Sequence, residues 1–282
     1  MPSSFPQSPI QQLHVLEMNE FFEEIDGDFN FAGTLIVYED ENEMHHAVLE
    51  DRCTSPSDIR PDLLKNDIQI PRSAYSPEFP SKFTLAPEPL PINSYIKKAS
   101  LISYDRIREG PQPDLIAKSV LMEAETCEVL RKHPHPNIAT YLGCQVSDGR
   151  ITGLCFAKYQ RTLMQEVNPE NLTKRQSRRS HQMVKDYNPV LAGIRSGLGH
   201  LHSLGLVHND INPRNIMFDG EQAVIIDFDT CRKIGEDLGN VGCTYEWCDE
   251  TTKQSVVEND LNALEEIRIW LCDDSKEFQF DE

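Results

Sequence analysis

The feature that most constrains this chain is a polar segment at residues 208–215 (HNDINPRN), enclosed between two short apolar runs. A Gly-Leu-Val run leads into it, and the second run, 223–226, ends at Asp227, twelve residues after Asn215. Short apolar runs bounded by turn-forming residues are typical of buried strands. The spacing therefore predicts that Asp210, Asn215 and Asp227 converge on one point.

Converging carboxylate and amide side chains indicate a site for a hard cation and a phosphate. Asp and Asn supply the oxygen ligands that Mg²⁺ prefers, and another Asp can accept a hydroxyl proton during phosphoryl transfer. An Asp followed five residues later by Asn is by itself a weak indication of such a site. The indication is strong here because a predicted apolar strand ends at Asp227, twelve residues after Asn215. His208 is interpreted as a structural residue bonded within the loop.

The charge of the chain is concentrated at its two ends. The 282 residues include 46 acidic and 27 basic ones, for a net charge of −19. Residues 1–60 hold 13 acids and two bases, whereas residues 61–245 are nearly neutral. A nucleic-acid or anionic-membrane binder needs a concentrated basic surface, so both classes of partner are excluded. With no apolar run long enough to span a membrane and no signal-peptide pattern, we expect an intracellular, cytoplasmic protein.

Eight cysteines are scattered along the chain without a Cys-x-x-Cys pair. Most lie inside apolar runs, where a buried reduced thiol is favoured over a metal ligand or a disulfide. Cys243 and Cys248 are the nearest neighbours.

The pattern of apolar residues and prolines divides the chain into an N-terminal extension, a proline-rich connector and a longer region of regular secondary structure. We expect an acidic extension at 1–70, with a short helix around 16–25 and a hairpin at 33–50. Prolines are dense in the connector 71–93, which is either a linker or an extended strap. Beyond it, the patterns predict strands at 94–101, 138–146 and 151–159, helices at 114–132, 188–204 and 260–271, and a solvated basic loop at 173–185.

These elements resemble the protein-kinase-like superfamily, particularly the small divergent protein-kinase-like proteins of filamentous fungi. The stretch GLGHLHSLGLVHNDINPRN…AVIIDFD is similar to the kinase αE helix, catalytic loop and metal-binding segment. EAETCEVLRKHPHPNIATYLGC resembles the αC helix running into the next strand, and GNVGCTYEW resembles the end of an activation segment. The resemblance implies an α+β, two-lobed fold: a small β-rich N-lobe at 94–160 and a mainly helical C-lobe at 161–282, truncated after the αF-like helix.

On the transfer side, the resemblance implies roles for four residues. Asp210 corresponds to the catalytic base, and Asn215 and Asp227 correspond to Mg²⁺ ligands. Arg214 occupies the place where tyrosine kinases carry a charge-compensating arginine.

On the nucleotide side, the resemblance implies that Lys97 holds the α- and β-phosphates of ATP. An acid on the αC-like helix would tether it; Glu123 is the first choice and Glu125 the second. The adenine would meet the backbone of the hinge residues Lys158, Tyr159 and Gln160.

The sequence also departs from the kinase pattern. No glycine occurs between Gly33 and Gly110, so a glycine loop covering the phosphates is missing. Asn209 stands where most protein kinases have Arg, Asn212 stands where they have Lys, and Asp229 replaces the glycine of the Asp-Phe-Gly motif.

Three functions remain open. The first is a phosphotransferase moving the γ-phosphoryl group of ATP to a Ser or Thr hydroxyl with Mg²⁺. The second is a pseudokinase that binds or scaffolds a protein partner with little or no transfer. The third is a small-molecule kinase of the choline or aminoglycoside type, which also favours a His-x-Asp motif followed by Ile-Asp-Phe and an acid.

Overall fold

The computed structural model of this chain describes residues 13–180, 185–239, 242–272 and 275–280. It divides into two compact units, the first made of residues up to Glu78 with Lys98–Val120, the second of Phe79–Lys97 with the chain from Leu121 on. The expected domain boundaries do not coincide with these units. The connector 71–93 is split between the units, and residues 98–120 leave the expected N-lobe because their apolar side chains pack in the core of the first unit.

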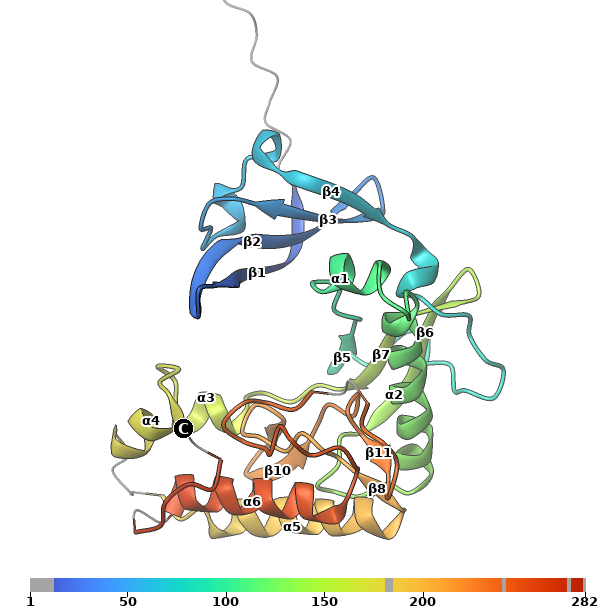
Figure 1. Cartoon of the computed structure of the whole chain (residues 1–282). Helices are drawn as coiled ribbons and strands as arrows, with labels where there is room; N and C mark the ends of the chain where they lie inside the picture. Colours follow the sequence, from blue (N-terminus) through green and yellow to red (C-terminus); the bar gives the residue numbers. More distant parts are fainter. Residues whose placement is uncertain (1–12, 181–184, 240–241, 273–274, 281–282) are drawn as a thin grey trace, which may run out of the picture. The chain divides into compact units, whose positions relative to one another are not determined.

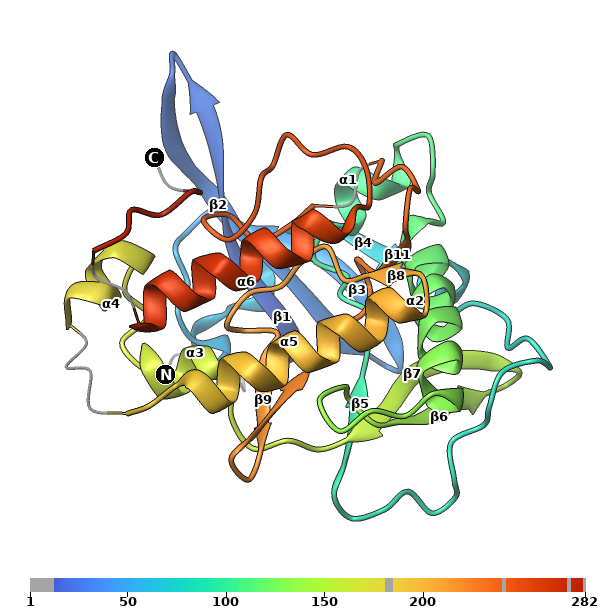
Figure 2. The ribbon, with the colours of Figure 1, turned by 90° about the horizontal axis from the view of Figure 1, so that it is seen from below.

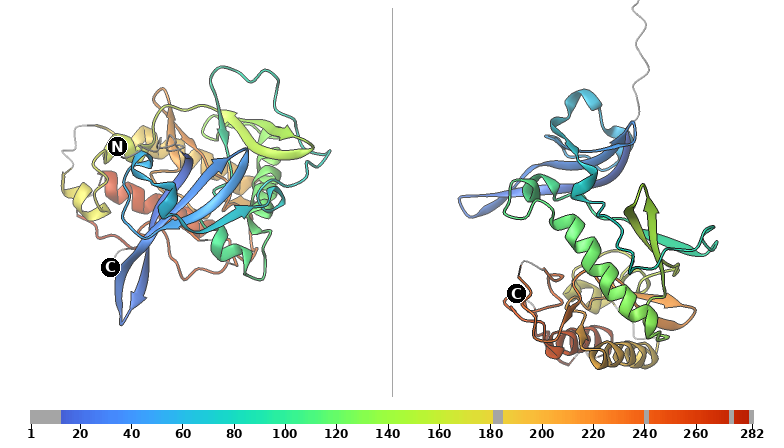
Figure 3. Two further views of the ribbon diagram at one scale, coloured as in Figure 1. Left: turned by 90° about the horizontal axis from the view of Figure 1, so that it is seen from above. Right: turned by 90° about the vertical axis from the view of Figure 1, so that its right-hand side faces the viewer.

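The first unit contains a four-stranded antiparallel sheet in the order β1 (His14–Ile25), β2 (Asp28–Asp40), β3 (Glu43–Leu49) and β4 (Lys65–Ile70) (Figure 1). The helix expected around 16–25 is wrong. Asp26 and Gly27 have φ angles of 54° and 89°, which suit a two-residue hairpin turn, and this turn pairs the segment with β2. The β1–β2 hairpin projects beyond the rest of its sheet (Figure 3).

The core of the first unit lies on both faces of this sheet. Ile36 and Tyr38 pack in one apolar cluster, whereas Val37 packs in another with Leu101 and Tyr104. Successive side chains of a strand point to opposite faces, so the alternation along β2 fills both clusters. The short helices of this unit are α1 (Tyr104–Arg108) and three 3₁₀ turns, Pro56–Asp58, Pro61–Leu63 and Arg72–Ala74.

The second unit carries its own three-stranded antiparallel sheet, in the order β5 (Ser94–Lys97), β7 (Arg150–Ala157) and β6 (Tyr141–Ser147). The extended segment 79–93 is a strap on β6: the N–H of Cys144 donates to the carbonyl of Thr84, and the N–H of Ala86 donates back to Cys144. Gly143 permits this approach, because a Cβ there would lie 2.6 Å from the Ala86 nitrogen. The helix α2 (Leu115–Lys132) begins in the first unit and contributes residues 121–132 to the second (Figure 3).

The remainder of the second unit is mainly helical. Helices α5 (Asn188–Ser203) and α6 (Val257–Cys272) lie side by side in Figures 1 and 2, and their buried residues include Ile194, Leu198 and Trp270. The smaller elements are α3 (Leu163–Val167), α4 (Lys174–Ser180), β8 (Leu206–Val207), β9 (Ile216–Asp219), β10 (Gln222–Ile225) and β11 (Arg232–Lys233), with β9 paired to β10 and β8 to β11. No helix in the described part of the chain is long and apolar enough to cross a membrane.

Two local expectations are corrected here. The basic segment 173–185 is not simply a solvated loop, because α4 forms within it and Lys174 is buried in an ion pair with Glu266 (2.7 Å). The preference for reduced cysteines does not hold for Cys243 and Cys248, which form a disulfide.

Candidate active site

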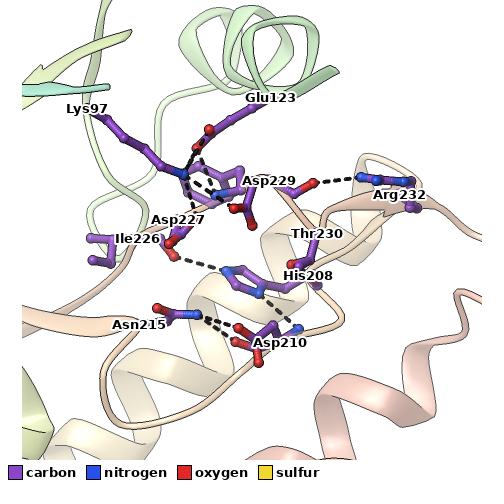
Figure 4. A network of polar contacts seen from close by, with 11 residues as sticks. Lys97, Glu123, His208, Asp210, Asn215, Ile226, Asp227, Asp229, Thr230 and Arg232 are labelled. Atoms are coloured by element: carbon purple, nitrogen blue, oxygen red, sulfur yellow. Dashed lines mark hydrogen bonds and ion pairs between the residues drawn. The ribbon is translucent and has the colours of Figure 1, made fainter. Parts of the chain in front are cut away.

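Lys97 lies at the centre of a cluster of carboxylates in the second unit (Figure 4). Its Nζ donates to both carboxylate oxygens of Glu123, at 2.7 and 2.8 Å, and to Oδ1 of Asp227 at 2.6 Å. The Oδ2 atom of Asp229 is 3.7 Å from the same nitrogen. Lys97 ends β5, Glu123 projects from α2, and Asp227 follows β10. Three carboxylates thus surround one ammonium group.

The pKa values of this cluster follow from burial and from the single cation. Burial disfavours the charged ammonium, but Glu123 and Asp227 outweigh it and raise the pKa of Lys97. Burial raises the pKa of Glu123 despite Lys97. Burial also acts on Asp227, yet the charge and hydrogen bond of Lys97 lower its pKa. The pKa of Asp229 is raised, by burial first and by the neighbouring Asp227 charge.

The catalytic-loop residues predicted from sequence form a second group. The amide Nδ2 of Asn215 donates to Oδ2 of Asp210 at 3.0 Å and to the Asp210 carbonyl at 2.9 Å (Figure 4). The backbone N–H of Thr244 donates to the other carboxylate oxygen, Oδ1, at 2.8 Å. Asn212 donates to the Thr244 hydroxyl at 3.0 Å. Both oxygens of Asp210 are therefore oriented by neutral donors.

Buried polar groups hold this loop in place. The side chain of Asp260, on α6, accepts the backbone N–H groups of His208 and Asn209 at 2.9 and 2.8 Å. The His208 ring donates through Nε2 to the carbonyl of Ile226 (3.0 Å) and accepts the N–H of Asp210 (3.3 Å). His208 thus links the loop to the residue before Asp227, consistent with the structural role that the sequence indicates.

A cavity of about 360 Å³ opens beside Lys97, within the second unit. Apolar side chains dominate its wall, among them Ala139, Phe156 and Met217, while Lys97, Glu123 and Asp227 form its polar part. Lys158 and Tyr159 also line it. The Tyr159 hydroxyl accepts the N–H of Thr140 at 3.0 Å, which fixes the ring of this hinge residue.

Three predicted residues lie outside these two groups. The exposed side chain of Arg214 donates to Oδ1 of Asn171 at 2.8 Å. Gln160 is exposed and is not among the residues that line the described cavity. Glu125, the second choice for tethering Lys97, instead pairs with Lys82 at 2.7 Å.

Sequence reasoning did not assign two contacts of the site. The sequence pattern marks Asp229 only as the replacement for a glycine and does not predict its 3.7 Å approach to Lys97. Thr244 was not singled out, although the segment that contains it was compared with the end of an activation segment. That comparison is the available signal in the sequence.

The donor set fits a divalent cation that also binds phosphate. The carboxylate of Asp227 and the amide oxygen of Asn215 are hard ligands, and Glu123, Asp227 and Asp229 together exceed the charge of Lys97 by two. Within the described residues, no group of three or more His, Cys, Asp or Glu side chains is arranged to hold a metal by itself. Mg²⁺ commonly binds through one or two protein side chains and takes its other ligands from phosphate and water.

Several known proteins are similar in sequence to this chain. The family model of the protein kinase domain matches residues 97–256, more than half of the chain. Serine/threonine-protein kinase/endoribonuclease IRE1 of Hypocrea jecorina (strain QM6a) is 28% identical over 125 residues, covering 43% of this chain and 10% of that protein. Calcium/calmodulin-dependent protein kinase type 1B of Rattus norvegicus is 28% identical over 122 residues, or 42% and 33% of the two chains. Kinase suppressor of Ras 2 of Homo sapiens is 30% identical over 104 residues, or 35% and 10%. The matched region spans a third or less of each of these relatives.

Proposed function

This chain belongs to the protein kinase domain family, and on that premise we propose that it transfers the γ-phosphoryl group of ATP to a Ser or Thr hydroxyl with Mg²⁺. The observation that carries the proposal is the presence of two complementary groups in one unit. A lysine paired with carboxylates lines an apolar cavity, and an aspartate oriented by neutral donors lies in the loop that precedes the β9–β10 pair, after which Asp227 follows.

Nucleotide binding would use the cavity beside Lys97. An adenine ring would enter between the apolar side chains of Ala139, Phe156 and Met217, next to the backbone of Lys158 and Tyr159. Lys97 is pre-positioned by Glu123, so its ammonium group can neutralise phosphate oxygens without a large loss of side-chain freedom. Asn215 and Asp227 would hold Mg²⁺, which neutralises charge on the phosphates during transfer.

The transfer step would use the carboxylate of Asp210. As the substrate hydroxyl oxygen bonds to the γ-phosphorus, its proton passes to Asp210 and the bond to the β–γ bridging oxygen breaks, which releases ADP. Asn215 and Thr244 fix the orientation of the carboxylate for this contact. Arg214 would compensate charge on the transferred group after exchanging its contact with Asn171.

Two observations favour a second candidate, a kinase-like protein that binds nucleotide or a protein partner with little transfer. The absence of glycine between residues 33 and 110 removes the amides that usually cover the phosphates. Asp229 adds a negative charge 3.7 Å from Lys97, which opposes the approach of phosphate.

Thermal unfolding with and without Mg·ATP tests nucleotide binding. We expect millimolar Mg·ATP to raise the melting temperature of the wild-type chain, because a ligand that binds only the folded state stabilises it. Lys97→Met should remove this rise, whereas Lys98→Met, at the neighbouring lysine, should retain it. A wild-type melting temperature that does not respond to Mg·ATP contradicts the phosphotransferase and leaves only the protein-binding form of the second candidate.

Phosphate incorporation separates the two candidates. Mass spectrometry after incubation with Mg·ATP and generic Ser/Thr peptides should find phosphorylated product with the wild-type chain and none with Asp210→Asn. Nucleotide binding without phosphate incorporation on the chain or on a peptide would favour the binding protein.

A further inference from the structure

A disulfide lies beside the catalytic loop. Cys243 and Cys248 are bonded, with their Cα atoms 6.2 Å apart and five positions apart in sequence. The ring that this bond closes contains Thr244, whose N–H donates to Oδ1 of Asp210 and whose hydroxyl accepts from Asn212. A covalent link thus encloses the residue that orients one oxygen of Asp210.

The two ends of this ring are held differently. Trp247 is buried and packs edge-to-face against Trp270 of α6, with ring centroids 5.4 Å apart. The Nζ of the buried Lys174 lies 5.2 Å from the Trp247 ring centre. The disulfide adds a second covalent link, from Cys243 to the residue after Trp247. Opening it would leave Thr244 joined to the anchor by the backbone and by the hydrogen bond that the Trp247 N–H donates to the Thr244 carbonyl at 3.1 Å.

The disulfide is also placed for reaction with a thiol. Cys243 and Cys248 are both partly exposed, and both line a cavity of about 190 Å³ beside Asn209 and Ile211. Five other cysteines are buried, at positions 53, 127, 144, 155 and 231. Thiol–disulfide exchange requires access and thiolate character, so exchange would be confined largely to this pair and the part-exposed Cys272.

We propose that Cys243–Cys248 is a thiol–disulfide exchange site whose closed form holds Thr244 against Asp210. The reductant is a dithiol. One of its thiolates attacks a disulfide sulfur, the other protein sulfur leaves as a thiolate and takes up a proton, and the second thiol of the reductant then displaces the remaining protein thiol. Two electrons pass to the protein, and the dithiol becomes a disulfide. The reverse reaction uses the oxidised dithiol.

The effect on activity rests on the proposed phosphotransferase function. Closure keeps the Thr244 donor on Asp210, and opening allows the carboxylate to turn away from its productive orientation. The oxidised chain should therefore transfer phosphate faster than the reduced chain, with the KM for ATP unchanged because Lys97 and its cavity lie elsewhere in the unit.

The first measurement does not depend on kinase activity. The full chain is treated with dithiothreitol under native conditions, and its thiols are alkylated and counted by mass spectrometry. Hydrogen exchange then follows the Thr244 amide. We expect two additional alkylated thiols, at Cys243 and Cys248, and an exchange rate about tenfold higher, the change that loss of one hydrogen bond can produce. The Cys243→Ser/Cys248→Ser double variant should show the fast exchange with and without dithiothreitol, and Cys272→Ser should behave like wild type.

The second measurement compares kcat for peptide phosphorylation in the oxidised and reduced chains. We expect kcat to fall about tenfold on reduction, with no dithiothreitol effect in the double variant. Resistance of the disulfide to native reduction, or equal Thr244 exchange in both forms, would overturn the proposal. If reduction speeds hydrogen exchange at the Thr244 amide but neither form transfers phosphate, the proposed phosphotransferase activity is wrong while the thiol–disulfide exchange site is retained. Equal kcat values in both forms would overturn control of Asp210.

Discussion

The lysine cluster and the catalytic loop lie in the same unit but are stabilised by different interactions. Around Lys97, three carboxylates compete for one ammonium group in the wall of a cavity. Around Asp210, neutral amide and backbone donors orient the carboxylate, and the fully buried Asp260 holds the loop through its N–H groups. Ion pairs respond to pH and to added charge, whereas buried hydrogen bonds mainly fix geometry. The structure thus separates an adjustable electrostatic site from a rigid positioning site.

The largest effect should come from Asp260, because its removal leaves buried donors unpaired. Asp260→Ala deletes the acceptor for His208, Asn209 and the ring of His202, and should lower the free energy of unfolding by about 3–5 kcal/mol. Urea denaturation measures the loss. Glu258→Ala, at an exposed acid of the same helix, is the control. Equal midpoints for the two variants would show that the loop does not depend on this buried acceptor.

Lys97→Met should have a smaller effect on stability than Asp260→Ala. It leaves Glu123, which is 4% exposed, without its counter-charge, but protonation of that carboxyl can relieve the cost. We expect the free energy of unfolding to fall by about 2 kcal/mol at neutral pH. The Lys97→Met/Glu123→Gln double variant should recover part of the loss. A double variant less stable than the single one would contradict a stability role for the pair.

Asn209 tests the rigidity of the loop at a single residue. Its amide donates to Val207 and Thr230 carbonyls and to the Ser255 hydroxyl, and its backbone has φ 67°. Asn209→Ala should cost about 1–2 kcal/mol from the lost hydrogen bonds and from the left-handed backbone. Asn209→Gly removes the hydrogen bonds but adopts the left-handed backbone without steric cost. Its free energy of unfolding, measured by urea titration, should therefore lie between those of wild type and Asn209→Ala. If Gly destabilises more than Ala, the backbone conformation is not part of the cost.

The smallest effects concern the pH dependence of stability. The contributions of Asp227 and Glu123, which both bond to Lys97, should change with pH in opposite directions. The pKa of Asp227 is lowered from 3.8, so its stabilising contribution is present above pH 3.8 and is lost as pH falls through the folded pKa. The pKa of Glu123 is raised from 4.5, so its contribution is present below pH 4.5 and declines as pH rises through the folded pKa. Each slope is at most about 1.4 kcal/mol per pH unit.

Variants separate these two slopes. The stability difference between wild type and Glu123→Gln should shrink as pH rises above 4.5. The difference between wild type and Asp227→Asn should grow as pH rises towards 3.8. Thermal or urea unfolding between pH 3 and 7 measures both differences. If the two stability differences change with pH in the same direction, Lys97 does not affect the Glu123 and Asp227 carboxyls differently, as proposed here.

Local patterns in the sequence were sufficient to predict most of the longer helices and strands of the second unit. The periodic apolar residues predicted α2, α5 and α6 to within a few residues, since a buried helix face must repeat every three to four positions. The strands expected at 138–146 and 151–159 correspond to β6 and β7, which pair antiparallel. The prediction is wrong around residues 16–25, where the apolar and acidic side chains fit both a helical and a strand periodicity. The turn at Asp26-Gly27 pairs this segment with β2 and makes it a strand.

The sequence by itself determined which polar residues could serve a phosphate site, because their types and spacing are local properties. Only the tertiary structure decided which of them meet. Lys97 reaches Glu123 rather than Glu125 because of the rotational position of α2, and Thr244 reaches Asp210 across 34 residues of chain. The Cys243–Cys248 bond was likewise decided by the path of the loop. Contacts between residues distant in sequence depend on the packing of whole elements, which no short motif contains.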